Sequence, residues 1–180
     1  MALNTPLDNP RGDIDLGAAE DTPDAKKREF LLHVVQPGLA GLMDGSVSSL
    51  APLFAAAFST HNSHTTFLVG MATAVGAGIS MAFSEALSDD GKITGRGDPW
   101  KRGAVCGAMT LFGAAGHTLP FLIHDFSAAT WFASIIVFVE LLIIAWIRHK
   151  YMDTPIGKAV LQVVFGGVVV FAAGVLIGKS

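Results

Sequence analysis

Cysteine is almost missing from this chain, since Cys106 is the only one among its 180 residues. An intramolecular disulfide and a cysteine-based metal cluster are therefore excluded. Charged residues are also scarce, at 15% of the chain, and the net charge of −3 offers no basic surface for a nucleic acid. The sequence contains no nucleotide-binding glycine loop, no paired-histidine zinc helix and no Ser/His/Asp motif. We therefore expect neither an enzyme nor a permanently bound cofactor.

Hydrophobic residues, by contrast, make up 51% of the chain and are gathered into long runs. A helix of about 20 apolar residues is long enough to cross a bilayer. We expect an all-α integral membrane protein with a five-helix transmembrane domain over residues 30–180, preceded by a polar, disordered tail at residues 1–29. The tail lacks the basic start and apolar core of a cleaved signal peptide. The five expected spans are residues 34–58, 65–87, 103–123, 128–147 and 159–177.

Basic residues alternate between the expected loops. Loops on one side carry nearly all of them, and Lys179 alone lies on the other side. Cytoplasmic loops are enriched in Lys and Arg, so we expect the N-terminus in the cytoplasm and the C-terminus outside. The residues that support this orientation are Lys26, Lys27, Arg28, Lys92, Arg96, Lys101, Arg102, Arg148, Lys150 and Lys158.

Glycines recur four residues apart within the expected spans, as at Gly103 and Gly107 and at Gly174 and Gly178. Helices in lipid associate where small residues let their backbones approach. We expect these glycines to mark packed helix faces.

Asp44 is a carboxylate inside an expected membrane span, where charged side chains are normally rare. It lies about ten residues, or ~15 Å, inside the first expected span. An ionised aspartate near the bilayer centre costs at least ~2.5 kcal/mol, so it faces a cavity or a partner. The alternative is a protonated Asp44 that is bonded to a serine, such as Ser48, or to a backbone carbonyl. We favour a functional carboxylate.

Met81 and Glu85 stand four residues apart in the second expected span, on one face of a helix. A methionine alone fits simple packing, and Glu85 is close enough to the boundary to reach water. Together, a carboxylate oxygen and a soft sulfur suit Fe²⁺ or Mn²⁺ better than Ca²⁺ or Mg²⁺. We expect a metal site made of Asp44, Met81 and Glu85.

Two further polar residues lie inside expected spans. Glu140 is surrounded by apolar residues in IIVFVELLIIAW, and His117 occupies the outer half of the third span. A carboxylate and an imidazole can both exchange protons and bind metals. We expect Glu140 and His117 to act in proton coupling or in a secondary metal path, with a simple structural pairing as the alternative.

Asp89 and Asp90 follow the second span in the turn SDDG. The spacing does not match a calcium loop, and a helix stop is the simplest interpretation. Their negative charge at the cytoplasmic side also suits the mouth of a cation path.

Four segments carry a family resemblance: QPGLAGLMDGSVSSLAP, GAGISMAFSEAL, GAAGHTLPFLI and GGVVVFAAGVLIG. Over residues 30–180 the chain resembles the vacuolar iron transporter (VIT) family, most of all the membrane half of bacterial membrane-bound ferritin-like iron exporters. The resemblance implies a five-helix homodimer in the lipid bilayer that moves Fe²⁺, often Mn²⁺ as well, out of the cytoplasm against protons. It also implies that Asp44 and Met81 lie on a metal path at the subunit interface. Glu85 matches the bacterial branch only.

Two departures from the family pattern bear on function. Many members carry a cytoplasmic metal-binding domain between the second and third spans, where this chain has only SDDGKITGRGDPWKR. The N-terminal tail is also too short for a ferritin-like domain. We expect a proton-coupled Fe²⁺ or Mn²⁺ exporter, with the bacterial inner membrane as its location. The alternatives are a non-transporting scaffold or partner of a ferritin-like protein, and a passive metal channel.

Overall fold

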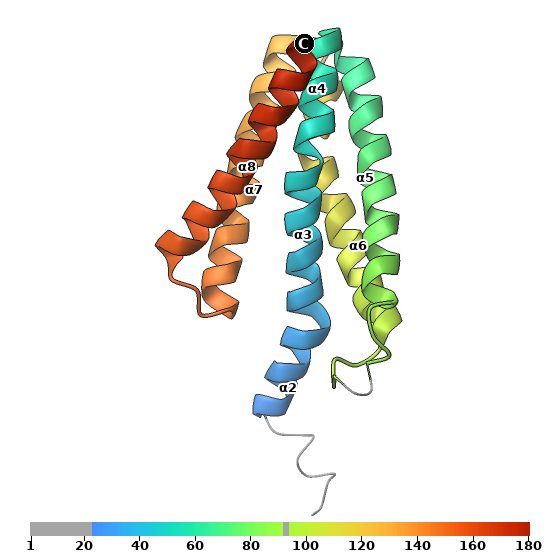
Figure 1. Cartoon of the computed structure of the whole chain (residues 1–180), viewed down its shortest axis with the longest axis vertical. Coiled ribbons are helices and arrows are strands. Elements are labelled where there is room, and N and C mark those ends of the chain that lie inside the picture. The colour runs from blue at the N-terminus through green and yellow to red at the C-terminus, as the bar shows by residue number, and fades with distance from the viewer. Residues whose placement is uncertain (1–22, 92–93) are drawn as a thin grey trace, which may run out of the picture.

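The computed structural model describes residues 23–91 and 94–180, and every regular element in these residues is helical (Figure 1). The predicted all-α class is therefore confirmed. The elements are α2 (Pro23–Phe30), the π-helical turn η1 (Leu31–Val35), α3 (Gln36–Ser48), α4 (Leu50–Thr60), α5 (Ser63–Ala86), α6 (Pro99–Gly116), the 3₁₀ turn η2 (Leu119–Leu122), α7 (Phe126–Tyr151) and α8 (Ile156–Lys179).

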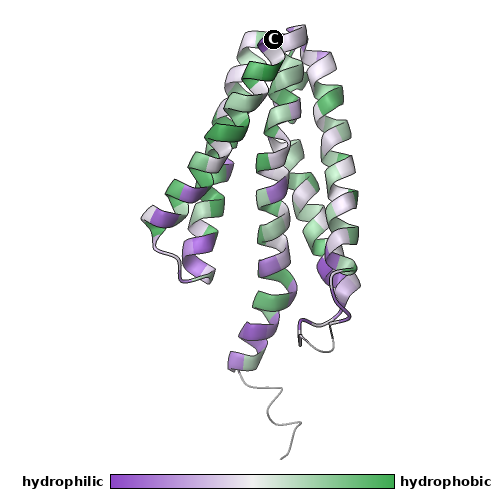
Figure 2. Cartoon of the chain, viewed as in Figure 1, coloured by the Kyte–Doolittle hydropathy of each residue, from purple (hydrophilic) through white to green (hydrophobic). Residues whose placement is uncertain are grey.

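Four helical stretches in the described residues are long and apolar enough to cross a membrane. They are Pro23–Thr60, Ser63–Ala86, Phe126–Tyr151 and Ile156–Lys179, and they cover the first, second, fourth and fifth predicted spans. Figure 2 shows their hydrophobic middles, with hydrophilic residues gathered toward the lower end. The third predicted span corresponds to α6 and η2. It is not among the four, because the 18 residues of α6 include Lys101 and Arg102.

Side-chain caps explain where three of the helices begin. The Asn62 carboxamide oxygen accepts a hydrogen bond from the Thr65 N–H at 2.8 Å at the start of α5. Asp98 and Asp125 do the same for α6 and α7, accepting from the N–H groups of Trp100 and Ala128. Such residues satisfy backbone donors that a helix leaves unpaired in its first turn. The second, third and fourth predicted spans therefore begin within about one helical turn of the observed helix starts.

The N-terminal helix begins earlier than the sequence analysis places it. Residues 23–29, assigned there to a disordered tail, form α2 instead, while residues 1–22 lie outside the described part of the chain. Asp24 in its first turn and Lys27 and Arg28 in its last complement the helix dipole. Local electrostatics therefore extend a helix whose apolar section starts only at the π turn.

The helices form two layers. In Figure 1, α8, α3 with α4, and α5 lie in front, while α7 and α6 lie behind. α6 packs against both α5 and α3, and α8 packs against α4 and α7. Toward the lower end of the figure, α8 leans away from α3. The two helices contact each other little along this part, and a groove opens between them.

Glycine pairs allow the closest helix contacts. A Cβ on Gly103 or Gly107 of α6 would lie 2.5 Å from a backbone oxygen of α5, that of Ala82 or Gly78. On α3, a Cβ on Gly41 or Gly45 would overlap backbone oxygens of α6. The same spacing recurs at Gly174 and Gly178 of α8, which lie against Ala51 and Ala55 of α4. The predicted packed faces at the pairs in α6 and α8 are confirmed.

Replacing Gly107 with alanine tests the contact between α5 and α6. The added methyl group would meet a backbone oxygen that cannot rotate away, so we expect Gly107→Ala to destabilise the protein by about 1–3 kcal/mol. Gly76→Ala is the control, because a Cβ there has nothing within 4 Å. Thermal unfolding in detergent compares them, and equal melting temperatures for the two variants would contradict the close approach.

Candidate functional site

Asp44 lies half-buried in the groove between α3 and α8. The groove encloses about 480 Å³, and Met43, Val47, Ser48 and Gln162 also line it. The Ser48 hydroxyl donates to the Asp44 backbone carbonyl at 2.6 Å. Among the described residues, no Lys, Arg or His forms an ion pair with the Asp44 carboxylate.

Gln162 is a groove residue that the sequence analysis missed. It is exposed on α8 and faces the same groove as Asp44. Its side chain is the one carboxamide between Lys158 and Lys179, in a stretch that otherwise holds only apolar residues and glycine. A single polar residue in an apolar helix is a signal that the sequence offers. A search restricted to ionisable side chains does not find Gln162, because its amide is neutral.

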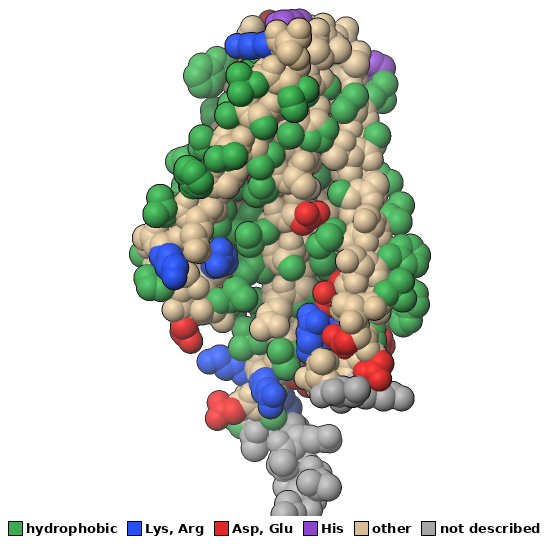
Figure 3. Space-filling view, viewed as in Figure 1, with side chains coloured by type: hydrophobic (Ala, Val, Ile, Leu, Met, Phe, Trp, Pro, Cys, Tyr) green, Lys and Arg blue, Asp and Glu red, His purple; other side chains and the backbone are tan. Residues whose placement is uncertain are grey.

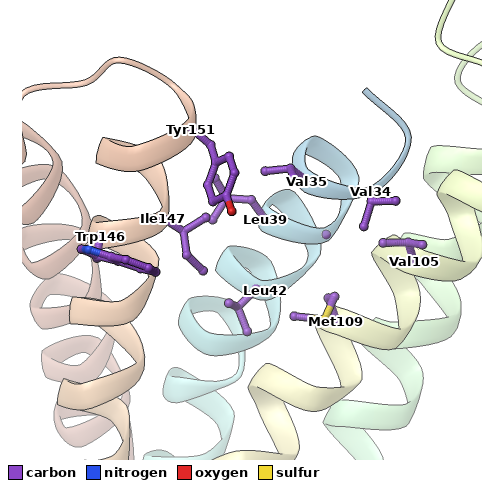
Figure 4. Close-up of a pocket in the computed structure, with 10 residues that line it drawn as sticks. Val34, Val35, Leu39, Leu42, Val105, Met109, Trp146, Ile147 and Tyr151 are labelled. Carbon is purple, nitrogen blue, oxygen red and sulfur yellow. The ribbon is translucent and has the colours of Figure 1, made fainter. Parts of the chain in front are cut away.

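A second groove on the other side of α3 is apolar. It encloses about 330 Å³ between α3, α6 and α7, and Figure 4 shows its wall of aliphatic and aromatic side chains, including Leu42, Met109 and Trp146. No Asp, Glu or His lines it. This groove therefore offers no carboxylate or imidazole to a cation, unlike the groove on the α8 side of α3.

Met81 lies half-buried on α5, outside the set of residues that line the Asp44 groove. Within residues 23–91 and 94–180 there is no group of three or more His, Cys, Asp or Glu side chains placed to hold a metal ion. A single chain therefore brings Asp44 and Met81 into one layer of helices without assembling a complete metal site.

Glu85 and Asp89 each accept hydrogen bonds from two arginines. Arg102 donates from Nε to Glu85 Oε1 at 2.9 Å and from Nη2 to Asp89 Oδ2 at 3.1 Å. Arg96 donates to the same two oxygens, at 2.7 and 3.1 Å. Two guanidinium groups thus hold the predicted metal ligand Glu85 at its Oε1 atom, and a metal ion bound at this oxygen would compete with both.

Arg102 holds this end of the molecule together. Its side chain is fully buried, and its Nη1 also donates to the backbone carbonyls of Arg96 and Gly97, at 3.1 and 3.2 Å. Partial burial alone raises the pKa of Asp89. The Gly91 N–H and the charge and hydrogen bond of Arg102 outweigh that effect and leave the pKa below its ordinary value of 3.8. Asp90 is exposed in the same turn.

His117 and Glu140 meet in the interior. His117 is fully buried at the end of α6, and its Nδ1 lies 2.9 Å from Oε2 of Glu140 on α7. Its Nε2 lies 2.9 Å from the hydroxyl of Ser49, between α3 and α4. Two residues chosen separately from the sequence are thus direct neighbours. Both imidazole nitrogens are engaged, which favours a proton-carrying role over a metal-binding one.

A comparison with protein families matches residues 86–179 to the model of the VIT family. The chain belongs to the VIT family. No curated protein and no solved structure matches the chain. The VIT match spans α6, α7 and α8, and so includes His117, Glu140 and Gln162, whereas Asp44, Met81 and Glu85 precede it. Family membership and the apolar helices identify an integral membrane protein of metal ion transport.

The lowered pKa of Asp89 predicts acid sensitivity in this VIT protein. A carboxyl group with a depressed folded-state pKa contributes stability above its ordinary pKa and loses it as the pH falls through the folded-state value. We expect the melting temperature to fall as the pH drops below 3.8, and to fall less in Asp89→Asn. Circular dichroism in detergent measures both.

The control for this experiment is Asp153→Asn, an exposed carboxylate in the α7–α8 connection. Its φ of 48° suits asparagine, so the backbone is not disturbed. This variant should keep the wild-type acid dependence. Identical acid dependence in Asp89→Asn and wild type would show that the arginine network does not depend on the Asp89 charge.

Proposed function

We propose that this VIT protein exports Fe²⁺ or Mn²⁺ from the cytoplasm in exchange for protons, along a path that passes Asp44. The observation that carries the proposal is the Asp44 carboxylate, half-exposed in a groove at membrane depth and without a basic partner among the described residues. A carboxylate costs several kcal/mol in hydrocarbon unless a cation or a polar partner meets it. A transported cation supplies the missing charge.

The proposed topology has five crossings, with α6 and η2 as the third. In Figure 1, α6 runs alongside α5 from the lower toward the upper end of the bundle. Figure 3 shows Lys and Arg side chains mostly toward the lower end, whereas Lys179 lies in the last turn of α8, at the opposite end. This asymmetry supports a cytoplasmic N-terminus and a C-terminus outside. The bacterial inner membrane is the proposed location because the sequence resembles the bacterial members of the family.

The proposed active unit is a homodimer. The groove with Asp44 and Gln162 is open on the outside of the chain and would otherwise face lipid. A second copy placed against α3 would cover both polar groups and bring a second Asp44 and Met81 to the path. Two carboxylates and two thioethers form a donor set suited to Fe²⁺ or Mn²⁺. We assign Asp44 and Met81 as the ligands, and Glu85, Asp89 and Asp90 to the cytoplasmic mouth.

The short α5–α6 connection favours one rival function. It leaves no room for a separate cytoplasmic metal-binding domain, so the chain could instead serve as a membrane scaffold or as the partner of a ferritin-like protein. Purified protein in liposomes that contain a metal-sensitive dye separates these functions. A scaffold gives no metal flux, a passive channel gives flux that ignores a pH gradient, and an antiporter responds to the gradient.

Replacing Asp44 tests the proposed path. Asp44→Asn keeps the size of the side chain and removes the charge, so we expect at least a tenfold loss of Mn²⁺ flux into the liposomes, with unchanged folding. Met81→Leu should reduce the flux less, because water or a second carboxylate can replace one thioether. Asp153→Asn controls for the loss of an exposed carboxylate. Wild-type flux in Asp44→Asn would exclude this path.

Cross-linking tests the homodimer. Cys106 is buried, so a cysteine introduced at Gln162 is the only accessible thiol in the described residues. We expect Gln162→Cys to form a disulfide-linked dimer in native membranes under mild oxidation. Trp131→Cys is the control, because this exposed residue lies on α7, in the rear layer. Equal cross-linking of the two variants would contradict an interface on the α3–α8 side.

A further inference from the structure

The contact between His117 and Glu140 is part of a hydrogen-bonded chain across three helical segments. Ser49 lies between α3 and α4, His117 ends α6, and Glu140 lies in the middle of α7. Ser49 and His117 are fully buried, and the Glu140 side chain is 15% exposed. Glu140 approaches so closely that a Cβ on Gly116 would overlap its Oε1. A side chain at position 116 would therefore require the Glu140 carboxylate to shift.

The direction of one hydrogen bond decides the others. The Ser49 hydroxyl donates its single proton to the Gly45 backbone carbonyl at 2.5 Å. Ser49 Oγ can then only accept from His117, so Nε2 carries a proton. The remaining ring nitrogen, Nδ1, faces Glu140 Oε2 at 2.9 Å. A hydrogen bond at this distance needs one proton between these two atoms, on the imidazole or on the carboxyl group.

We propose that His117 and Glu140 hold one exchangeable proton as a unit, and that Ser49 transmits its loss to the Gly45 carbonyl beside Asp44. The inference rests on the proposed antiport function and assigns its proton-carrying site. With the proton present, the pair is neutral overall, either as imidazolium with carboxylate or as imidazole with carboxylic acid. With the proton gone, the pair carries one negative charge.

Loss of the proton reverses the direction of the hydrogen bond between His117 and Ser49. Neutral His117 facing an ionised Glu140 keeps its remaining proton on Nδ1, because two lone pairs would otherwise meet at 2.9 Å. Nε2 then becomes an acceptor, and the Ser49 hydroxyl turns toward it. The Gly45 carbonyl loses its hydrogen bond from Ser49. The released proton passes to water, and no covalent bond between heavy atoms changes. The charge of the pair falls by one unit for the one proton that leaves.

The Gly45 carbonyl lies at a sensitive place in the first transmembrane stretch. It follows Asp44 directly, and α3 ends at Ser48, three residues later. Pro52 lacks an N–H, so it cannot satisfy the carbonyl of Ser48 four residues before it. The proton state of the pair therefore acts where the helix is already interrupted and where the proposed metal ligand is attached.

Few other titratable side chains lie in the membrane-spanning helices near His117 and Glu140. Within the membrane-spanning parts of the helices that surround the pair, Asp44 on α3 and Cys106 on α6 are the remaining titratable groups. α5 has no charged residue between His64 and Glu85, α7 has none but Glu140 before Arg148, and α8 has none between Lys158 and Lys179. Asp44 faces the α8 groove, and Cys106 is a buried free thiol.

Infrared difference spectroscopy between two pH values tests the shared proton without any transport. In wild type we expect imidazole and carboxyl bands to change at one common pH, together with a shift of an amide carbonyl band. His117→Gln and Glu140→Gln should each abolish both side-chain changes. Ser49→Ala should remove the amide shift and keep the side-chain changes. Independent midpoints for the two side chains, or bands that survive in either Gln variant, would overturn the proposal.

Mn²⁺ accumulation in liposomes with an imposed pH difference tests the coupling. One exchanged proton changes the accumulation ratio about tenfold per pH unit. We expect this dependence in wild type and its loss in His117→Gln and Glu140→Gln, each measured relative to the same variant without a gradient. Ser49→Ala should weaken the dependence. Wild-type flux without any pH dependence, or full dependence in Glu140→Gln, overturns the inference and leaves metal transport standing. Absence of all wild-type flux refutes the proposed function itself, and the infrared result then decides the shared proton.

Discussion

Hydrocarbon does not solvate charge, and this constraint organises the whole molecule. Arg102 is fully buried, yet two carboxylates and two carbonyls surround its guanidinium group. His117 is buried as deeply, with Ser49 and Glu140 on its two nitrogens. Asp44 is the exception, because it opens to the outside of the chain. Among the described residues the other buried charges are paired within the chain, and this contrast is the reason for proposing an external cation partner for Asp44.

α6 is the helix that makes these pairings possible. It has Arg102 near its start and His117 at its end, which lowers its hydropathy below that of the four apolar helices. α6 packs closely against α3 and α5, and glycines on all three helices permit that packing. Arg102, near the start of α6, bonds to the α5–α6 connection, and His117, at the end of α6, contacts Glu140 on α7.

Apolar runs and basic loops were enough to predict the helical class and the approximate helix positions, because both follow from the bilayer alone. The pairing of side chains was less accessible. The sequence predicts Glu85 as a ligand because it stands one turn from Met81. In the structure, the α5–α6 connection brings Arg96 and Arg102 to the Glu85 carboxylate instead. His117 and Glu140 were each identified by their location among apolar residues. Their contact depends on how α6 and α7 pack, which no spacing within either helix encodes.

The first transmembrane stretch links the two proposed sites through its own geometry. Asp44 and Ser48 are four residues apart and lie on one face, toward α8. Gly45 and Ser49, one residue further on, lie about 100° around the helix and face α6. One short segment therefore carries the proposed metal-binding carboxylate on one side and the proposed proton-dependent hydrogen bond on the other. A carrier that exchanges a cation for a proton needs each binding event to alter the other site. In the proposed mechanism, the interruption of the helix after Ser48 would provide that connection within about one turn.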